Sequence, residues 1–595
     1  MNRKQRRAAQ KSGKHTIVNS AELFQAQATK EQVLLSQAIS LMQAGDHQKA
    51  EETLRRAYEM APKHPEIVHY LGMCLFYQGR IDEALPIVGN SLNLRENDPN
   101  FLSNFGVVAY SGGNIDLAIA NYFKSLELFA DNPDVLTNLS AALNDKDRFS
   151  EALVTADKAI ELNPDGRGAY LNRGNALKAM ERVEEAITDY KKSLEIDPDY
   201  AHAYTMLGHA YDITGELELA EKNTRLAVTL APDMYEGHNN HATVLMRLGK
   251  MAEANMHLAK SQELRPNAKT LWNMALNLLQ MGDFKQGIAL YEFGFGAKTR
   301  LPNRKPPMPR WQGQDLTGKS ILIWREQGVG DELRFAEWYH DVIALGGRCI
   351  IEAKEKLVPL FERSFPEATV LEENFSRDVG RADADYQVPA GALPALFGLR
   401  DNSGNPYSYL KPDPFRAKAW RERMDALGEG AKIGICWRSS LRNARRNFAY
   451  ADLEDLTPLF ELPNTQFINL QYDDCQDLLD DFEQRTGIKI HNFPEVDQFD
   501  DLDETAAMTS ALDMVVSSGT AVAQMAGALG VETWRFEARG SKPNHPPITH
   551  PWLQPNGFVW PGHWQEPWLD VMTRMAENLA ERLQQPNAPE AARAS

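Results

Sequence analysis

The amino-acid sequence predicts an α-helical solenoid followed by an α/β region made of two parallel-sheet halves. Small residues recur every 34 positions through the first half of the 595-residue chain. A proline-rich stretch ends that pattern, and short apolar runs then alternate with helical stretches. A period of this length indicates stacked helix pairs, whereas apolar runs of this kind are typical of parallel strands buried on both faces.

The repeat consists of three columns of residues. One column holds alanine, at Ala50, Ala84, Ala118, Ala152, Ala186, Ala220 and Ala254. A second column holds small residues that let paired helices touch, at Gly72, Gly106, Ser140, Gly174, Gly208 and Ala242. A third holds prolines that stop the second helix of a unit, at Pro164, Pro198, Pro232 and Pro266. These columns resemble the tetratricopeptide repeat family over residues 31–298. The resemblance implies a solenoid whose concave face holds an extended polypeptide.

Five asparagines on the repeats are candidates for holding such a polypeptide: Asn104, Asn138, Asn172, Asn239 and Asn273. Amide side chains can bond to the backbone of a bound peptide. Asparagine on a solvated helix face is an equally good interpretation. The three columns do not indicate a ligand, because the packing of stacked helices alone explains why small residues and prolines recur at these positions.

Composition limits the partners and the location of the chain. The formal net charge of −18 would repel a phosphate backbone, so we expect no nucleic-acid partner. A basic tail, residues 1–30, is expected to be flexible, and it lacks the apolar core of a secretory signal peptide. No apolar run reaches the roughly 18 residues of a membrane-spanning helix. The four cysteines lack CxxC spacing, so neither disulfides nor a zinc site are expected and the chain is expected to be cytoplasmic.

The second part of the chain follows a proline-rich segment, residues 299–318, which is expected to be a stiff connector. Apolar runs predict parallel strands at residues 321–324, 349–352, 433–437, 467–471 and 514–517. A proline-containing run at 405–414 divides this region into halves, residues 319–414 and 415–585, and a flexible tail, 586–595, ends the chain. Each half has the size of one Rossmann-like unit, so a ligand is expected in the cleft between them.

The first half carries a candidate catalytic carboxylate after its first strand. The loop there contains Arg325, Gln327, Gly328, Gly330 and Asp331, and its two glycines let the backbone approach a ligand. Asp331 can take a proton from an attacking hydroxyl group. It can equally act as the N-cap of the helix that follows, and spacing alone does not separate the two roles.

The second half carries two candidate anion-binding segments. The loop after its first strand contains Arg438, Ser439, Ser440, Arg442, Arg445 and Arg446. Guanidinium groups match phosphate or carboxylate oxygens in pairs, although surface ion pairs are an alternative for this loop. The turn after the strand at 514–517 contains Ser518, Gly519 and Thr520, with Gln524 on the following helix. Free N–H groups at a helix start hold anions, whereas tight packing alone would also select the small residues of this helix.

These three segments together resemble the GT-B glycosyltransferases of the heptosyltransferase-like type, over about residues 311–583. The resemblance implies that Asp331, in a Gly-x-Gly-Asp turn, is the base that activates the acceptor. It also implies that the second half binds a nucleotide-sugar donor through the Arg438–Arg446 loop and the Ser518–Gln524 turn. Relatives carry an acid and a histidine where this chain has Gly519 and Gln524. The identity of the donor therefore cannot be inferred from the heptose-transferring members. The arginines of the second half are more compatible with an anionic donor.

The complete layout resembles bacterial enzymes that modify flagellin. The resemblance implies that the solenoid binds flagellin and that the α/β region transfers a nonulosonic acid from a CMP-linked donor to Ser or Thr. We therefore expect a protein O-glycosyltransferase with a nucleotide-sugar co-substrate. No metal is expected, because no clustered ligands appear in the sequence. Two alternatives stay open: a non-catalytic scaffold with a degenerate GT-B domain, and a transferase acting on lipopolysaccharide.

Overall fold

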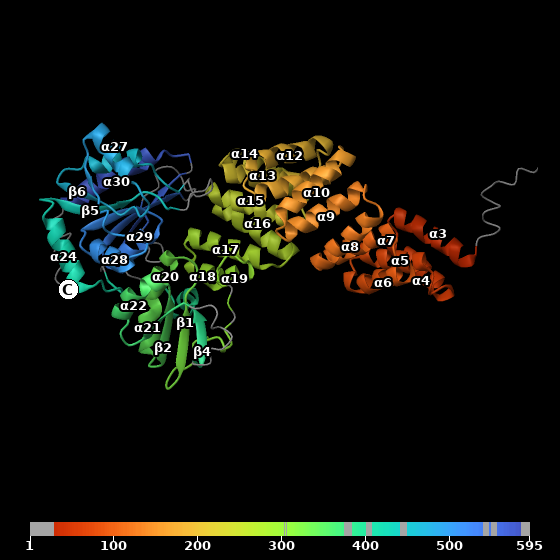
Figure 1. Ribbon diagram of the computed structural model, residues 1–595, viewed down its shortest axis with the longest axis horizontal. Coiled ribbons are helices and arrows are strands. Elements are labelled where there is room, and N and C mark those ends of the chain that lie inside the picture. The colour runs from red at the N-terminus through yellow and green to blue at the C-terminus, as the bar shows by residue number, and fades with distance from the viewer. Residues whose placement is uncertain are drawn as a thin grey trace, which may run out of the picture. The chain divides into compact units, whose positions relative to one another are not determined.

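The computed structural model describes residues 29–302, 304, 306–373, 384–399, 407–440, 449–538, 547–548, 556–563 and 565–584. The chain divides into two compact units, Met1–Met206 and Leu207–Ser595. The first unit holds helical repeats. The second unit holds the last repeats together with two parallel sheets (Figure 1).

The predicted tetratricopeptide solenoid is confirmed, and its helices follow one another in pairs. They are α3 (Lys30–Gln43), α4 (His47–Met60), α5 (Pro65–Tyr77), α6 (Ile81–Leu94), α7 (Pro99–Ser111), α8 (Ile115–Leu128), α9 (Pro133–Asp145), α10 (Phe149–Leu162), α11 (Arg167–Ala179), α12 (Val183–Ile196), α13 (Ala201–Thr214), α14 (Leu217–Leu230), α15 (Tyr235–Arg247), α16 (Met251–Leu264), α17 (Ala268–Met281), α18 (Phe284–Tyr291) and α19 (Phe293–Gly296).

Local sequence signals set the ends of these helices. Helix α7 begins at Pro99, whose missing N–H is no loss at a first helical position. The Asp98 side chain caps this helix by accepting hydrogen bonds from the backbone N–H groups of Asn100, at 3.0 Å, and Phe101, at 3.2 Å. The prolines of the third column lie two residues beyond α10, α12, α14 and α16, so they end helices as predicted.

The small-residue columns lie where helices touch. Every alanine of the first column is fully buried. A Cβ atom added at Gly106 would lie 2.5 Å from the ring of Tyr122, and one added at Gly174 would lie 2.6 Å from the ring of Tyr190. Glycine is therefore required at these positions, because a large ring of the second helix packs directly on the backbone of the first.

The first sheet lobe, residues 319–399, contains a four-stranded parallel sheet. Its strands are β1 (Ser320–Trp324), β2 (Arg348–Ala353), β3 (Thr369–Glu372) and β4 (Tyr386–Pro389), in the order β3-β2-β1-β4. Its helices are α20 (Val329–Phe335), η1 (Ala336–Trp338), α21 (Tyr339–Ala344), η2 (Glu355–Leu357), α22 (Val358–Ser364), η4 (Ala390–Ala392) and α23 (Leu393–Phe397).

The second sheet lobe, residues 407–584, contains a six-stranded parallel sheet. Its strands are β5 (Ala431–Cys436), β6 (Thr465–Asn469), β7 (Ile490–His491), β8 (Met514–Ser518), β9 (Glu532–Ala538) and β10 (Gly557–Gly562). Its helices are α24 (Pro414–Asp425), η5 (Leu453–Leu456), α26 (Thr457–Phe460), α27 (Gln476–Thr486), α28 (Leu502–Ser510), α29 (Ala521–Ala528) and α30 (Trp568–Leu583). The order β10-β9-β8-β5-β6-β7 is that of doubly wound nucleotide-binding sheets.

The predicted α/β fold is thus confirmed, and the five predicted strands correspond to β1, β2, β5, β6 and β8. The sequence did not predict β3, β4, β7, β9 or β10. The segment predicted as a stiff connector packs against the first sheet instead of standing away from it. Trp311 and Leu316 are buried there, and the backbone N–H of Trp311 donates to the carbonyl of Gln387 on β4 at 2.8 Å.

We expect Gly174→Ala to lower the free energy of unfolding of the first unit by about 1–3 kcal/mol, because the added methyl group meets the Tyr190 ring. Circular dichroism at the helix band measures this loss. All eleven tryptophans lie in the second unit, so tryptophan fluorescence should report an unchanged transition. Gly168→Ala on the same helix is the control, because its added Cβ would meet a single methyl group of Thr137, at 3.2 Å. Equal stability of the two variants would contradict the prediction.

Candidate functional site

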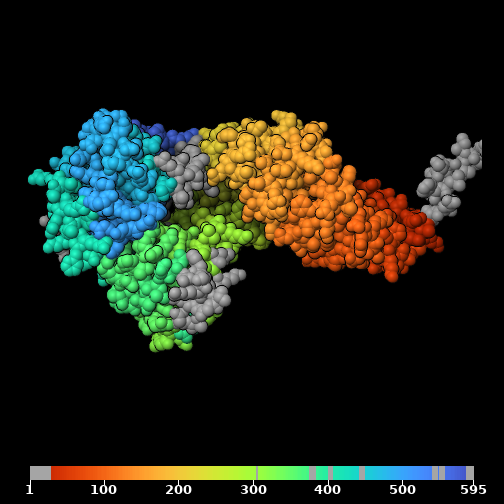
Figure 2. Space-filling view, viewed as in Figure 1, coloured from red at the N-terminus to blue at the C-terminus, as the bar shows by residue number. Residues whose placement is uncertain are grey.

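The candidate site lies at the carboxyl ends of the central strands of the two sheet lobes. In each doubly wound sheet the strand order reverses at one point, between β1 and β4 in the first lobe and between β5 and β8 in the second. Ligands of such folds bind outside the carboxyl ends of strands at these points. The two lobes meet there: a Cβ added at Gly330 on α20 would lie 3.4 Å from the Cα of Ala521 on α29. The green first lobe and the blue second lobe meet along one border in Figure 2.

Asp331 lies in the first turn of α20, beside this contact. Its Oδ2 accepts a hydrogen bond from the Gly328 N–H at 3.2 Å, so it caps the helix from the third helical position rather than from the N-cap. Burial raises the pKa of Asp331 above its usual range, and the bond from Gly328 and the charge of Arg334 oppose this rise. A carboxylate of raised pKa is a better general base than an ordinary one, so capping does not exclude catalysis.

The loop before Asp331 is held by Arg325 and by its own backbone. The Arg325 side chain is 6% exposed, and it pairs with Glu332 at 2.8 Å and with Glu373. It also donates to the carbonyl of Gln327 at 2.5 Å, and Gln327 has a positive φ of 62°. These contacts give Arg325, predicted as part of an acceptor loop, a structural part in shaping that loop.

A buried ion pair fixes this loop to the end of the solenoid. Arg300 and Glu326 are both 0% exposed, and Arg300 Nε donates to Glu326 Oε2 at 2.6 Å. Arg300 also donates to the carbonyl of Tyr291 on α18 at 3.0 Å, while Glu326 accepts from the N–H of Gly391 at 2.5 Å. A Cβ on Gly391 would collide with the carboxylate of Glu326, so glycine is needed for this approach.

On the second lobe, the turn from Ser518 to Gln524 faces the contact with α20. Thr520 is the N-cap of α29, and its Oγ1 lies 3.0 Å from the Oγ of Ser517. The Oγ of Ser518 and the Oε1 of Gln524 are buried without a hydrogen-bond partner among the described residues. Polar atoms of this kind are costly to bury unsatisfied, which favours a polar ligand at this turn.

The predicted arginine loop is described only in part. Arg438 pairs with Asp473 at 3.1 Å, and its backbone N–H donates to Gln471 at 3.2 Å. The Tyr472 hydroxyl donates to the Oγ of Ser439 at 3.0 Å and accepts from the N–H of Ser440 at 3.4 Å. Arg442, Arg445 and Arg446 lie outside the described residues.

Two arginines that sequence analysis missed lie near the contact between the lobes. Arg334 lies one helical turn beyond Asp331 on α20, and Arg535 lies on β9. Burial, and then the charge of Arg535, lowers the pKa of Arg334 to about 10. Burial likewise lowers the pKa of Arg535 to about 10, although Arg535 pairs with Glu537. The two guanidinium groups come from different lobes and interact electrostatically, and each also has an acidic neighbour, Glu337 for Arg334 and Glu537 for Arg535.

The five predicted asparagines lie on solenoid helices, and several of them bond within the solenoid. The Asn172 amide donates to the carbonyl of Thr137 at 2.8 Å, and Asn273 donates to Asn239 at 3.0 Å. Asn104 lies 3.0 Å from a ring nitrogen of His69, and Asn138 is half-buried. The bonds of Asn172 and Asn239, both buried, favour a structural part for these two residues over peptide binding.

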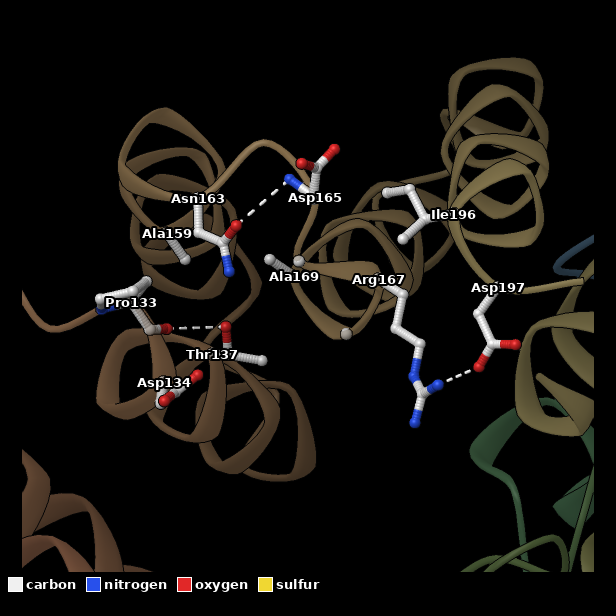
Figure 3. Close-up of a pocket in the computed structure, with 12 residues that line it drawn as sticks. Pro133, Asp134, Thr137, Ala159, Asn163, Asp165, Arg167, Ala169, Ile196 and Asp197 are labelled. Atoms are coloured by element: carbon white, nitrogen blue, oxygen red, sulfur yellow. Dashed lines mark hydrogen bonds and ion pairs between the residues drawn. The ribbon is translucent and has the colours of Figure 1, made fainter. Parts of the chain in front are cut away.

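A hollow of about 450 Å³ on the first unit offers another place for a peptide. Figure 3 shows it between α9, α10 and α11, with Arg167 turned toward Asp197 and the Asn163 side chain bonded to the N–H of Asp165. Three of its lining residues, Asp134, Asp165 and Asp197, are carboxylates, against the single cation Arg167. The hollow therefore carries net negative charge, and none of the five predicted asparagines lines it.

Comparison with known proteins supports the repeats directly. Models described as tetratricopeptide repeat match residues 41–103 and 201–234, and one described as TPR repeat matches residues 174–212. A solved tetratricopeptide repeat protein from Parabacteroides merdae is 17% identical and covers 42% of this chain and 98% of its own, with a TM-score of 0.38. A thermophilic TPR protein of Thermus thermophilus is 23% identical and covers 31% of this chain and 100% of its own, with a TM-score of 0.29.

A longer match joins this chain to the protein FlbA of Caulobacter vibrioides. The two are 31% identical over 346 residues, which cover 55% of this chain and 58% of FlbA. The chain therefore matches somewhat more than half the length of this relative. The matched share is larger than residues 31–298 provide, so the similarity includes residues outside the repeats. Among the described residues no helix is both long enough and apolar enough to cross a membrane.

We expect Glu326→Gln to destabilise the second unit by about 3–5 kcal/mol, because Arg300 then remains buried without its countercharge. Tryptophan fluorescence during urea unfolding measures the loss. The double variant Arg300→Met with Glu326→Gln removes both charges and keeps an acceptor for Gly391, so it should be more stable than Glu326→Gln alone. A double variant less stable than Glu326→Gln alone would contradict the importance of the pair.

Proposed function

We propose that the chain is a protein O-glycosyltransferase that uses an anionic nucleotide-sugar donor. The observation that carries the proposal is the meeting of α20, which bears Asp331 and Arg334, with the turn of the second lobe that leads into α29. One lobe thus contributes a carboxylate, and each lobe contributes a cation, half-buried Arg334 and buried Arg535, near the carboxyl ends of parallel strands. The match to FlbA is longer than the repeat region.

In the proposed reaction, Asp331 acts as the base, and the two arginines stabilise negative charge. Asp331 takes the proton of a Ser or Thr hydroxyl as its oxygen forms a bond to the anomeric carbon of the donor sugar. The bond from that carbon to the nucleotide phosphate breaks, and the phosphate leaves with the electron pair. Arg334 and Arg535 would stabilise the negative charge of the donor and of the leaving phosphate, because such charges interact strongly in a site that excludes water.

Gly519 supports an anionic donor. Relatives of the heptosyltransferase-like type carry an acid at this position, and a Cβ added at Gly519 would lie 3.9 Å from Nε of Arg535 and 3.8 Å from Glu537. A carboxylate at this place would compete with Glu537, which already pairs with Arg535. With glycine there, no side chain of this turn fills the space beside Arg535, and an anionic donor would bind by displacing Glu537 from Arg535.

The solenoid would supply the acceptor. Tetratricopeptide solenoids bind extended polypeptides, and a bound polypeptide presents its hydroxyl groups at high effective concentration. We propose flagellin as the acceptor, on the resemblance of the layout to flagellin-modifying enzymes, and a CMP-linked nonulosonic acid as the donor. The acidic hollow of the first unit suits a polypeptide segment with basic or amide side chains.

One observation favours a non-catalytic scaffold instead. The acid and the histidine of the related turn are replaced by Gly519 and Gln524, and the Oε1 of Gln524 is buried without a partner among the described residues. In a scaffold, the α/β region would bind without transfer. Transfer chemistry is the property that separates the two proposals.

We expect Asp331→Asn to abolish the mass that the enzyme adds to flagellin while leaving the fold intact, because an amide oxygen still accepts from the Gly328 N–H. Intact-mass measurement of flagellin from complemented deletion strains tests this. Asp570→Asn, an exposed acid in the first turn of α30, is the matched control. With purified components, the transfer rate should fall as pH is lowered through a pKa above the usual carboxyl range, because the base must be deprotonated. Full glycosylation by Asp331→Asn would favour another base.

We expect Gly519→Asp to weaken binding of a CMP-linked sialic acid by at least about 10-fold, equivalent to about 1.4 kcal/mol, because the new carboxylate competes for Arg535. Calorimetric titration measures the affinity. Gly519→Asn is the matched control, since it adds the same volume without the charge. Equal weakening by both variants would indicate a steric effect and would count against an anionic donor at this position.

A further inference from the structure

Three side chains of the solenoid, on helices that do not contribute to the reaction proposed above, approach one another. His241 lies on α15, and Glu253 and His257 lie four residues apart on α16. One possible ligand atom from each side chain lies within 4.8 Å of those of the other two. Within the described part of the chain this is the one group of three or more His, Cys, Asp or Glu residues so arranged. Sequence analysis missed it, because the three residues are spread over two helices.

A hydrogen bond fixes the tautomer of His241. The Thr224 hydroxyl donates to the carbonyl of Ala220 at 2.8 Å, and its oxygen lies 2.8 Å from Nδ1 of His241. A hydroxyl that already donates its proton can only accept, so Nδ1 of His241 carries the hydrogen. The lone pair of the neutral ring is then on Nε2.

Two further hydrogen bonds, both involving His238, give His257 the same tautomer as His241. Nε2 of His238 lies 2.9 Å from the carbonyl of Pro232, which can only accept, so His238 carries its hydrogen on Nε2. Its Nδ1 must then accept from Nδ1 of His257, 2.9 Å away. His257 is left with its lone pair on Nε2. Bonds of this kind, to the ring nitrogen that does not bind the metal, orient histidine ligands in metal sites.

Charged groups of both signs lie around the cluster. Glu253 is exposed and brings the negative charge. Arg225 and Lys250 are both paired with Glu221, which offsets their repulsion.

We propose that His241, Glu253 and His257 bind a divalent transition-metal ion that joins α15 to α16. Two imidazole nitrogens and one carboxylate form a common zinc ligand set, with a fourth position left for water. Ligand atoms of a tetrahedral zinc site lie roughly 3.4 Å apart, so distances within the cluster, which reach up to 4.8 Å, must shorten by up to about 1.4 Å on binding. Glu253 is exposed and His257 is half-buried, so their side chains can make this movement. The site is independent of the cleft and of the transfer reaction.

The test is a calorimetric titration of zinc chloride into the untagged, chelator-treated full chain. We expect about one zinc ion per chain and a higher midpoint of thermal unfolding in its presence. Glu253→Gln and His257→Gln should each weaken zinc binding by more than about 10-fold, because each removes a ligand. Thr224→Val removes the bond that orients His241, together with the hydroxyl's bond to the Ala220 carbonyl, and leaves all three ligands in place, so it should weaken zinc binding by about 10-fold or more.

Glu263→Gln, an exposed acid on the same helix, is the matched control and should bind zinc as the unaltered chain does. Glu253 is exposed, so its variant is expected to fold even if a histidine variant does not. Failure of the unaltered chain to take up one equivalent of zinc would overturn the proposal. Unchanged affinity in Glu253→Gln together with His257→Gln would also overturn it, because the zinc would then be bound elsewhere.

Discussion

The buried Arg300–Glu326 ion pair is the interaction on which the candidate cleft depends. Neither side chain reaches water, so each charge is stabilised mainly by the other and by the hydrogen bonds around them. Those bonds reach the Tyr291 carbonyl at the end of α18 and the Gly391 N–H after β4. This ion pair therefore joins helix α18 to the ends of β1 and β4, the two strands between which the strand order of the first lobe reverses. The backbone leading to Asp331 is fixed by this contact, and the position of a general base depends on that backbone.

Most of the fold could be predicted because its signals are local and repeated. The alanine column is buried in every repeat, and the apolar strands β1, β5 and β8 pair at the centres of their sheets. The missed strands carry weaker signals for physical reasons. Strand β7 has two residues, and β4 ends in Pro389. Strand β9 contains the charged residues Arg535 and Glu537. They interrupt its apolar run, so a search for apolar runs does not detect this strand. Those charged side chains also lie beside Gly519 in the Ser518–Gln524 turn, so the departure from the apolar pattern coincides with the candidate site.

The candidate site could be predicted only where its residues are adjacent in the sequence. Asp331 and the Ser518–Gln524 turn each follow a strand directly, and a strand end is recognisable in the sequence. Arg334 and Arg535 are 201 residues apart, and their proximity results from the contact between α20 and α29, which no local pattern records. Arg325 was predicted beside Asp331 for the same local reason, yet its guanidinium group is occupied by Glu332 and Glu373. Residues that are adjacent in the sequence therefore predicted the loops of the candidate site. They did not predict which charged side chains lie beside those loops.

Comparison with equivalent positions in the other repeats supports the proposal that the histidine cluster binds a cation. His241 occupies the position that holds Leu71, Leu139 and Leu207 in other repeats, and His257 lies 16 residues further on. In the repeat that has Arg173 at this position, Asp189 lies at the register of His257, and the two form an ion pair with an N···O distance of 2.6 Å. The solenoid thus accepts a polar pair across its helices when the two groups balance each other. Two neutral imidazoles, whose rings meet edge to face with centroids 4.6 Å apart, carry no opposite charges that could form such an ion pair. A cation held by His241, His257 and Glu253 would restore the balance that the carboxylate of Asp189 provides for Arg173.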